Sequence, residues 1–137
     1  MEKFEVDILG CGSALPTTRH FASSQVVNIR EKLFMIDCGE GAQLQLRRSK
    51  LKFTRLNHIF ISHLHGDHCF GLFPLIATLG LEGKRTPLDI YAPAPMGDIL
   101  EYHKKFFWDD LPYEVKWHEV KTTEHCIIFE NNTLEVW

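Results

Sequence analysis

Several features that would narrow the function are missing from this sequence. Its cysteines, Cys11, Cys38, Cys69 and Cys126, lie far apart and form no CxxC pair, which excludes a zinc ribbon and a thioredoxin-type motif. No hydrophobic run is long enough to cross a bilayer, and the N-terminus lacks the apolar core of a signal peptide. The net charge of −3 does not by itself indicate a nucleic-acid binder. We therefore expect a cytoplasmic protein with no membrane partner, whose thiols are reduced and buried.

The size and composition are those of one globular domain. The chain has 137 residues, of which 45% are hydrophobic, so we expect a single domain over 1–137. Apolar runs bounded by turn residues predict strands at 4–9, 24–29, 32–37, 58–62, 88–92, 113–120, 125–130 and 133–137. Helical spacing predicts helices at 41–49, 71–79 and 94–107. This order predicts an α/β or α+β class with a mixed sheet. Because the chain stops inside a strand-like run, we expect the domain to be incomplete at its C-terminus.

The densest group of reactive side chains follows the strand at 58–62. It contains four potential metal ligands in the pattern HxHxDH, namely His63, His65, Asp67 and His68. The loop begins at the carboxyl end of a strand, which is the usual edge for ligand sites in α/β sheets. Gly66 is expected to turn the chain sharply, so that both ligand pairs face one cavity. Imidazoles and carboxylates suit zinc and related divalent ions.

Two metal ions, roughly 3.5–4 Å apart, suit this turn better than one, because four groups so close in sequence cannot easily surround a single tetrahedral ion. The alternative is a pH-sensitive or merely solvated histidine cluster. His58 begins the preceding strand and faces a different way, so we expect it to be structural.

Several segments resemble a known family. HLHGDH at 63–68 matches the signature of the metallo-β-lactamase superfamily. The segments 8–17, 34–46 and 60–72 (ILGCGSALPT, FMIDCGEGAQLQL and FISHLHGDHCFGL) resemble its ribonuclease Z branch, the zinc-dependent endonucleases that trim the 3′ ends of tRNA. The resemblance covers essentially the whole chain, as the N-terminal half of the family's length. It implies about half of an αββα sandwich, with one mixed sheet and helices on its outer side.

The resemblance also implies roles for the ligands. His63 and His65 would bind one metal ion and Asp67 and His68 the other, with zinc as the metal and Asp67 also handling a proton. The family's remaining ligands lie downstream of the signature, and none of the later histidines, His103, His118 or His125, sits in a recognisable copy of those motifs. The resemblance implies pre-tRNA as substrate and a homodimer for the complete protein.

Asp37, in DCGEG, lies at a predicted strand end. One interpretation is that its carboxylate hydrogen-bonds an imidazole of the metal shell and selects its tautomer. The other is a helix-capping or turn role. The residues alone leave both open.

Cations that could contact RNA phosphates lie in two places. Arg19 lies in PTTRHF, a segment that helps to recognise the RNA 3′ end in the resembled family. A basic run surrounds Phe53 and contains Arg47, Arg48, Lys50, Lys52 and Arg55. Phosphate contacts by this run, with Phe53 stacked on a base, are one interpretation. A solvated helix end is the other. An aromatic set, Tyr102, Phe106, Phe107 and Trp108, is expected to be core or a dimer contact.

The leading functional hypothesis is a zinc-dependent phosphodiesterase, most specifically an RNA endonuclease in which two metal ions stabilise in-line displacement. A second hypothesis keeps the fold and changes the substrate to a small phosphodiester, a sulfate ester or a lactam. A third is a non-catalytic module whose exposed sheet edge and apolar face need a partner chain.

Overall fold

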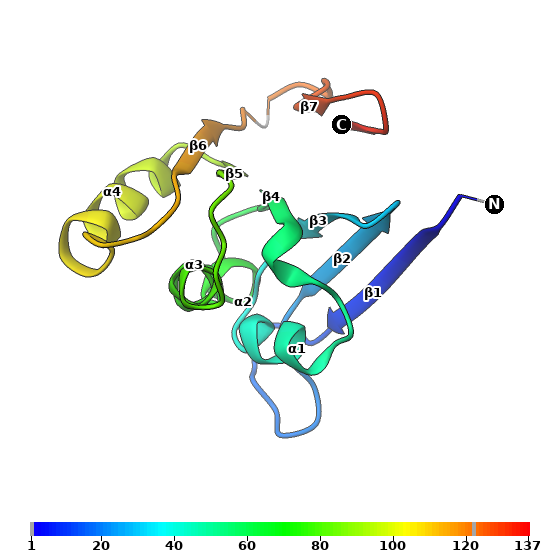
Figure 1. Cartoon of the computed structure of the whole chain (residues 1–137), viewed down its shortest axis with the longest axis horizontal. Coiled ribbons are helices and arrows are strands. Elements are labelled where there is room, and N and C mark those ends of the chain that lie inside the picture. Colours follow the sequence, from blue (N-terminus) through cyan, green and yellow to red (C-terminus); the bar gives the residue numbers. More distant parts are fainter. Residues whose placement is uncertain (1, 122) are drawn as a thin grey trace.

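A mixed sheet of six strands organises the molecule (Figure 1). The computed structural model describes residues 2–121 and 123–137. The strands lie in the order β1 (Phe4–Gly10), β2 (Ser24–Ile29), β3 (Lys32–Ile36), β4 (Leu56–Phe60), β5 (Leu88–Ala92) and β6 (Val115–Glu119). β1, β2 and β3 pair antiparallel, whereas β3, β4, β5 and β6 pair in parallel. The predicted mixed sheet is therefore confirmed.

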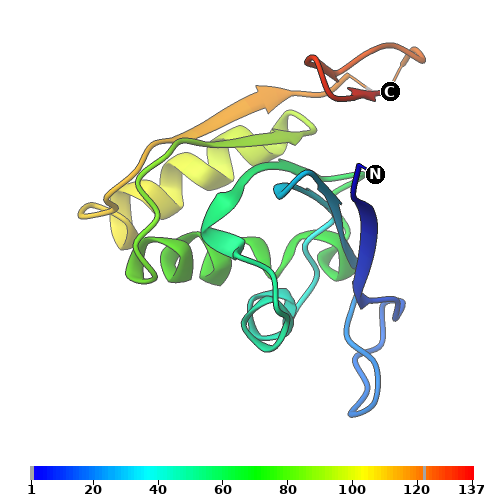
Figure 2. The same cartoon turned by 45° about the vertical axis from the view of Figure 1, so that its right-hand side comes forward.

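The helices cover one face of this sheet. They are α1 (Ala42–Arg48), α2 (Gly66–Cys69), α3 (Leu72–Leu81) and α4 (Pro95–Phe107), with a single 3-10 turn at Phe53–Arg55. Figure 2 shows α1 (cyan), α3 (green) and α4 (yellow) below the sheet and a small hairpin (red) above it. That hairpin pairs β7 (Phe129–Glu130) with β8 (Glu135–Val136). The predicted arrangement, with helices on the outer side of one sheet, is confirmed.

Strand alternation divides the apolar residues between two cores. Leu33, Met35 and Ile59 point toward the helices and belong to the main core. On the opposite face, a smaller cluster of Phe34, Phe60 and Tyr91 packs under the hairpin residue Phe129. Further along this inner face, the alternate residues of β1 stay exposed: Phe4, Val6 and Ile8.

His58 also lies on the inner face. Its ring stacks on Phe34 with centroids 5.3 Å apart and contacts Phe129 at 4.6 Å. The prediction that His58 is a packing residue, turned away from the histidine turn, is confirmed.

Some predictions about elements are wrong. Only Phe129–Glu130 of the strand predicted at 125–130 pairs, because its partner β8 is two residues long. The short helix α2 was not predicted, since four residues carry no helical periodicity. β4 begins at Leu56, two residues early, and ends at Phe60.

Predicted burial is wrong for two of the four cysteines. Cys38 and Cys69 are buried, but Cys11 and Cys126 are exposed. In the aromatic set of α4, Trp108 enters the core while the others, Tyr102, Phe106 and Phe107, face outward. Among the described helices, none combines the length and apolarity that crossing a membrane requires.

Candidate metal centre

Two parallel strands bring the site together. β3 ends at Ile36 and β4 at Phe60, and because the strands are parallel their carboxyl ends share one edge of the sheet. The backbone N–H of Asp37 donates to the carbonyl of Phe60 at 2.8 Å. Beyond it, the N–H of Cys38 donates to the carbonyl of His68, also at 2.8 Å. The loop after β3 is thus joined directly to the histidine turn.

Asp37 is the polar centre of this junction. It is 5% exposed and adopts a left-handed backbone (φ 57°), a conformation that costs a non-glycine residue about 1–3 kcal/mol. Its Oδ1 accepts from the Ser62 N–H at 2.8 Å, and its Oδ2 accepts from the Ser62 hydroxyl at 3.0 Å. Nδ1 of His68 lies 2.6 Å from the same Oδ2. Of the two interpretations of Asp37, the structure shows the hydrogen bond to an imidazole, whereas α1 has no side-chain cap.

These bonds set the tautomers of two histidines. An ionised carboxylate can only accept, so Nδ1 of His68 must donate to Asp37. The Ser62 hydroxyl donates its one hydrogen bond to Asp37. Towards His63 Nδ1, which lies 3.0 Å away, it can therefore only accept. In their neutral forms both rings therefore carry a free lone pair on Nε2, the form in which imidazole binds metals.

The four predicted ligands lie together. The ring centroid of His63 is 4.1 Å from that of His68 and 4.7 Å from that of His65. Asp67 Oδ2 is 3.4 Å from His68 Nε2. His65 is exposed, and the other three are partly buried.

The ligand atoms of these four side chains are of the kinds that bind divalent metal ions. The fold family also implies such ions. Its nitrogens and carboxylate oxygens are the usual ligands of zinc. Over residues 2–121 and 123–137, no three His, Cys, Asp or Glu side chains converge on one point that could hold an ion. The nearby thiols of Cys38 and Cys69 are buried, and burial raises the pKa of both, so they remain neutral core groups.

Close backbone contact between the two loops requires glycine. A Cβ on Gly39 would lie 2.4 Å from the carbonyl oxygen of Asp67, and one on Gly71 would lie 2.0 Å from that of Gly39. Gly66 was expected to be needed for a sharp turn of the backbone, and that reason was wrong. Gly66 begins helix α2, and what its missing side chain provides is room for the ring of Phe70.

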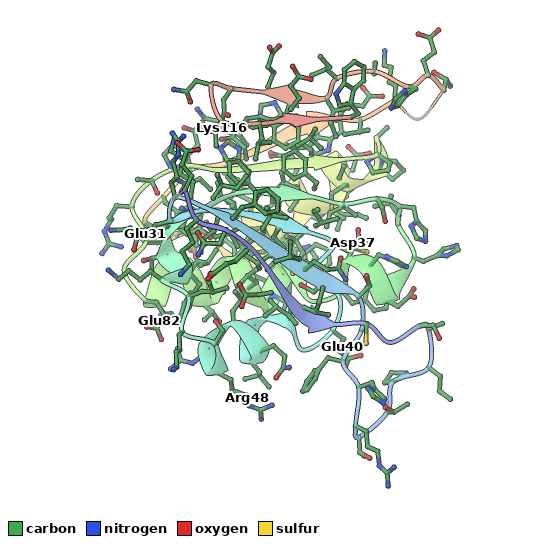
Figure 3. The ribbon with its side chains drawn as sticks, turned by 90° about the vertical axis from the view of Figure 1, so that its right-hand side faces the viewer. Glu31, Asp37, Glu40, Arg48, Glu82 and Lys116 are labelled. Atoms are coloured by element: carbon green, nitrogen blue, oxygen red, sulfur yellow. The ribbon has the colours of Figure 1, made fainter. Side chains whose placement is uncertain are left out.

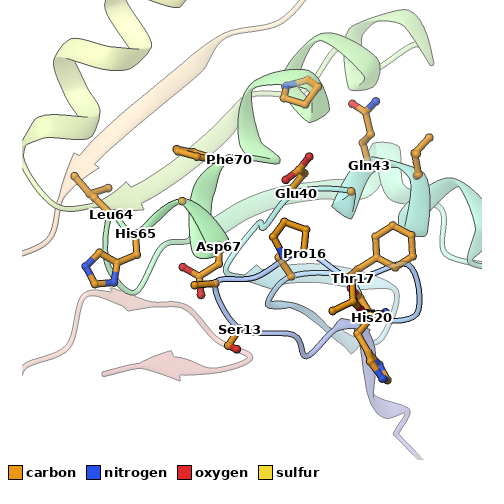
Figure 4. Close-up of a pocket in the computed structure, with 17 residues that line it drawn as sticks. Ser13, Pro16, Thr17, His20, Glu40, Gln43, Leu64, His65, Asp67 and Phe70 are labelled. Atoms are coloured by element: carbon orange, nitrogen blue, oxygen red, sulfur yellow. Dashed lines mark hydrogen bonds between the residues drawn. The ribbon is translucent and has the colours of Figure 1, made fainter.

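A cavity of about 820 Å³ opens beside the histidine turn (Figure 4). Its walls come from the loop between β1 and β2, the start of α1 and the region of α2. Its lining includes two of the predicted ligands, His65 and Asp67, and the side chains of Phe21, Glu40, Gln43 and Phe70. The volume falls within the roughly 300–1,000 Å³ typical of small-molecule sites.

The predicted RNA-contacting cations do not form one patch. Arg47 pairs with Glu82, and Arg55 pairs with Glu31. Figure 3 shows both of these acids at the side of the molecule away from Asp37. The other two cations of that region, Lys50 and Lys52, line a separate hollow that also contains Glu31.

Arg48 and Arg19 lie nearer to the cavity. The guanidinium of Arg48 is 5.8 Å from the ring centroid of Phe21, which lines the cavity. Arg19 is exposed in the loop between β1 and β2, and its backbone N–H donates to the Thr17 hydroxyl at 3.3 Å. Phe53, which one of the two interpretations stacks on an RNA base, packs partly buried against the main core.

Sequence reasoning missed four residues of the site. Ser62 was overlooked although it lies between the strand and HxHxDH, where a hydroxyl can bridge neighbouring side chains. The cavity residues Glu40, Gln43 and Phe70 carry no local pattern that marks them. They are recognisable only when the loops that surround the cavity are placed in space.

Comparisons with known proteins agree with this geometry. Residues 4–104 match the family described as anti-Pycsar protein Apyc1. The ribonuclease Z of Bacteroides thetaiotaomicron is 62% identical over 99% of this chain and 43% of its own length. The ribonuclease Z of Porphyromonas gingivalis is 50% identical over 100% of this chain and 45% of its own. The crystal structure of human tRNase Z, short form, superposes with a TM-score of 0.85 at 32% identity, over 98% of this chain and 58% of that one.

The chain thus spans less than half the length of these ribonuclease Z relatives, 43% of one and 45% of the other. The match to a family over residues 4–104 covers most of the chain. The expected resemblance to ribonuclease Z and to the metallo-β-lactamase fold is confirmed by the relatives and by the superposed structure. The chain belongs to the family described as anti-Pycsar protein Apyc1; it has the metallo-β-lactamase fold and is similar to ribonuclease Z over its whole length.

Proposed function

We propose that this chain carries part of the catalytic site of a metal-dependent phosphodiesterase, an RNA endonuclease of the ribonuclease Z type that processes the 3′ ends of pre-tRNA. The observation that carries the proposal is the pair of imidazoles, His63 and His68, whose Nδ1 atoms are hydrogen-bonded so that Nε2 can bind a metal, beside Asp67, which lines the cavity. The name of the superposed structure, human tRNase Z, supports the choice of tRNA among phosphodiesters.

Each residue of the turn has a proposed part. His63 and His65 would hold one divalent ion, and Asp67 and His68 would hold a second, with zinc as the preferred metal. When bound, such ions polarise a phosphate oxygen and lower the pKa of water. Asp67 orients the attacking water and accepts its proton. Asp37 and Ser62 orient the two imidazoles. Their hydrogen bonds keep the ring proton on Nδ1 and leave Nε2 as the nitrogen that can bind a metal.

The substrate path is proposed to run along the cavity. Arg48, beside Phe21, and Arg19 in the adjoining loop are the proposed phosphate contacts, because Arg47 and Arg55 are already paired with acids. The homodimer, the cytoplasmic location and the continuation of the domain beyond this chain remain predictions.

Metal content and cleavage together test the function. We would load the protein with zinc, measure bound metal by elemental analysis, and follow cleavage of a pre-tRNA with a labelled 3′ trailer. The variant that combines His63→Ala with His65→Ala should lose bound metal and cleavage together. His125→Ala is the matched control, because His125 is exposed and lies outside the turn.

Two outcomes would overturn the proposal. Equal metal content in the double variant and in the original protein would remove the histidine turn as the metal site. Hydrolysis of a small phosphodiester by a protein that leaves pre-tRNA intact would replace the RNA substrate with the small-molecule alternative.

A further inference from the structure

Phe70 is an exposed aromatic ring held beside the ligands. It follows the turn directly and is 64% exposed. Its ring nevertheless packs closely against the backbone of Gly66. A Cβ on Gly66 would lie 2.4–2.7 Å from three carbons of the Phe70 ring. The ring therefore packs over the Gly66 backbone and presents its remaining surface to the cavity that also contains His65 and Asp67. An apolar ring that is both exposed and fixed is suited to stacking.

A second ring lies in the wall of the same cavity. Phe21 is partly buried, and it packs against Gly41, where a Cβ would lie 2.3 Å from its Cδ1. Gly41 has a φ of 86°, so glycine is favoured there for its conformation as well as for the space. Arg48 places its guanidinium 5.8 Å from this ring. The cavity thus has an aromatic wall with a cation at its rim.

The lining of the cavity contains both a hydrogen-bond acceptor and a hydrogen-bond donor. Glu40 supplies a carboxylate, which accepts. Gln43, three residues further along, accepts a bond from the Thr78 hydroxyl at 3.3 Å on its Oε1, and its amide nitrogen remains available as a donor. Figure 4 shows Glu40 between Asp67 and Gln43 in this view. A carboxylate acceptor and an amide donor near aromatic rings match the mixed edges and flat faces of nucleobases.

We infer that this cavity is a base-binding subsite. It takes the base of a nucleotide that flanks the phosphodiester to be cut, with Phe70 stacked on the base, Glu40 and Gln43 at its edge, and Arg48 near the next phosphate. The inference rests on the proposed function for the position of the cut bond. It adds the positioning of a base, through residues that are not metal ligands.

The test compares binding of RNA with and without that base. Three short RNAs would share one sequence around a pre-tRNA cleavage site; one is unmodified, and each of the others has an abasic ribose on one side of the cut bond. Fluorescence anisotropy in the presence of a chelator gives their affinities without cleavage. The original protein should bind the unmodified RNA roughly tenfold more tightly than one of the abasic RNAs. Phe70→Ala should reduce this ratio to near one.

Phe106→Ala is the matched control, because Phe106 is 62% exposed on α4 and lies outside the cavity lining. It should keep the full ratio, and thermal unfolding would verify that both variants fold. A ratio near one in the original protein, or an unchanged ratio in Phe70→Ala, would overturn the base-binding subsite even if pre-tRNA is cleaved. A base-dependent ratio that Phe70→Ala abolishes supports the subsite even if the metal-loaded protein cleaves no pre-tRNA, which would overturn only the proposed function.

Discussion

The two ends of the parallel strands both carry buried polar groups, but they use them differently. At the amino end, Lys84 is only 1% exposed. Its Nζ donates to the Thr86 hydroxyl at 2.9 Å, to the Thr54 carbonyl at 3.4 Å and to Asn57 Oδ1. An ammonium group has three donors, so all of them are used. Burial lowers the pKa of Lys84 to about 8.

At the carboxyl end, bonding is complete on one side only. Asp37 accepts hydrogen bonds from Ser62 and His68 below the turn, whereas no hydrogen bond within the described residues involves Nε2 of His63 or His68, and Asp67 Oδ2 lies 3.4 Å from His68 Nε2. A polar cluster whose members are all paired stabilises the fold. One that is paired on its inner side and open on its outer side is preorganised to bind something else.

The largest effect should come from Asp67→Asn. If Asp67 accepts the proton of the attacking water, kcat for pre-tRNA cleavage should fall about 10²–10⁴-fold. Asp109→Asn, at an exposed position, is the control. An unchanged kcat would remove Asp67 from the proton transfer.

Asp37→Asn should act on metal binding. The new amide nitrogen can only donate, so it would face His68 Nδ1 as a donor and favour the tautomer with the proton on Nε2. Zinc affinity, measured by competition with a chelating dye, should fall about 10–100-fold. Ser62→Ala is a companion variant that loses only the bond relayed to His63. Wild-type affinity in Asp37→Asn would show that the tautomer is not set by Asp37.

Lys84→Met should affect stability alone. It leaves the buried acceptors around Nζ without their donor, which costs about 1–3 kcal/mol of unfolding free energy, measurable by urea denaturation. RNA cleavage at a temperature where the variant is folded should be unchanged. Lys104→Met, at an exposed position on α4, provides the control. A loss of activity in the folded variant would contradict the division between the two ends.

The same lysine gives a dependence on pH. Its folded pKa of about 8 is below the ordinary value of 10.5, so between these pH values the unfolded chain binds more protons than the folded one. The contribution of Lys84 to stability is therefore present above about pH 10.5 and is lost as pH falls through about 8. The stability difference between Lys84→Met and the original protein, followed by urea denaturation from pH 7 to 10.5, should change in that direction. A constant difference would contradict it.

The smallest effect should come from His58→Phe. Burial lowers the pKa of His58, and its Nδ1 has no hydrogen-bond partner among the described residues. Its stabilising contribution is present above pH 6.5 and is lost as pH falls further, because the unfolded histidine is protonated first. The original protein should lose more stability than the variant between pH 7 and 5, by a small amount because the ring is only partly buried. Parallel acid titrations of the two proteins would contradict the assignment.

The local parts of the site were accessible from the sequence, but its surroundings were not. HxHxDH after an apolar strand predicts ligands because all four lie within six residues. Asp37 was identified because strand ends meet at one edge of a sheet. Its choice between a cap and a histidine partner needed the fold, since the His68 side chain lies 31 residues away in sequence.

Side chains whose role depends on a distant neighbour could not be predicted. The pairing of Arg47 with Glu82 joins α1 to the end of α3, and nothing near either residue indicates it. The same holds for the three partners around Lys84 and for the exposed aromatic rings of α4, whose helical spacing suits a core face equally well.

The sequence by itself determined the class of fold, the position of the proposed metal ligands and the family, because these depend on periodicity and on residues that are close in the chain. The tertiary structure alone decided which nitrogens of the histidines carry the proton, which cation lies beside the aromatic wall of the cavity, and that Phe21 and Phe70 share this cavity. The physical reason is that hydrogen bonds, ion pairs and cavities depend on distances across the sheet, and parallel strands bring together residues that are far apart in sequence.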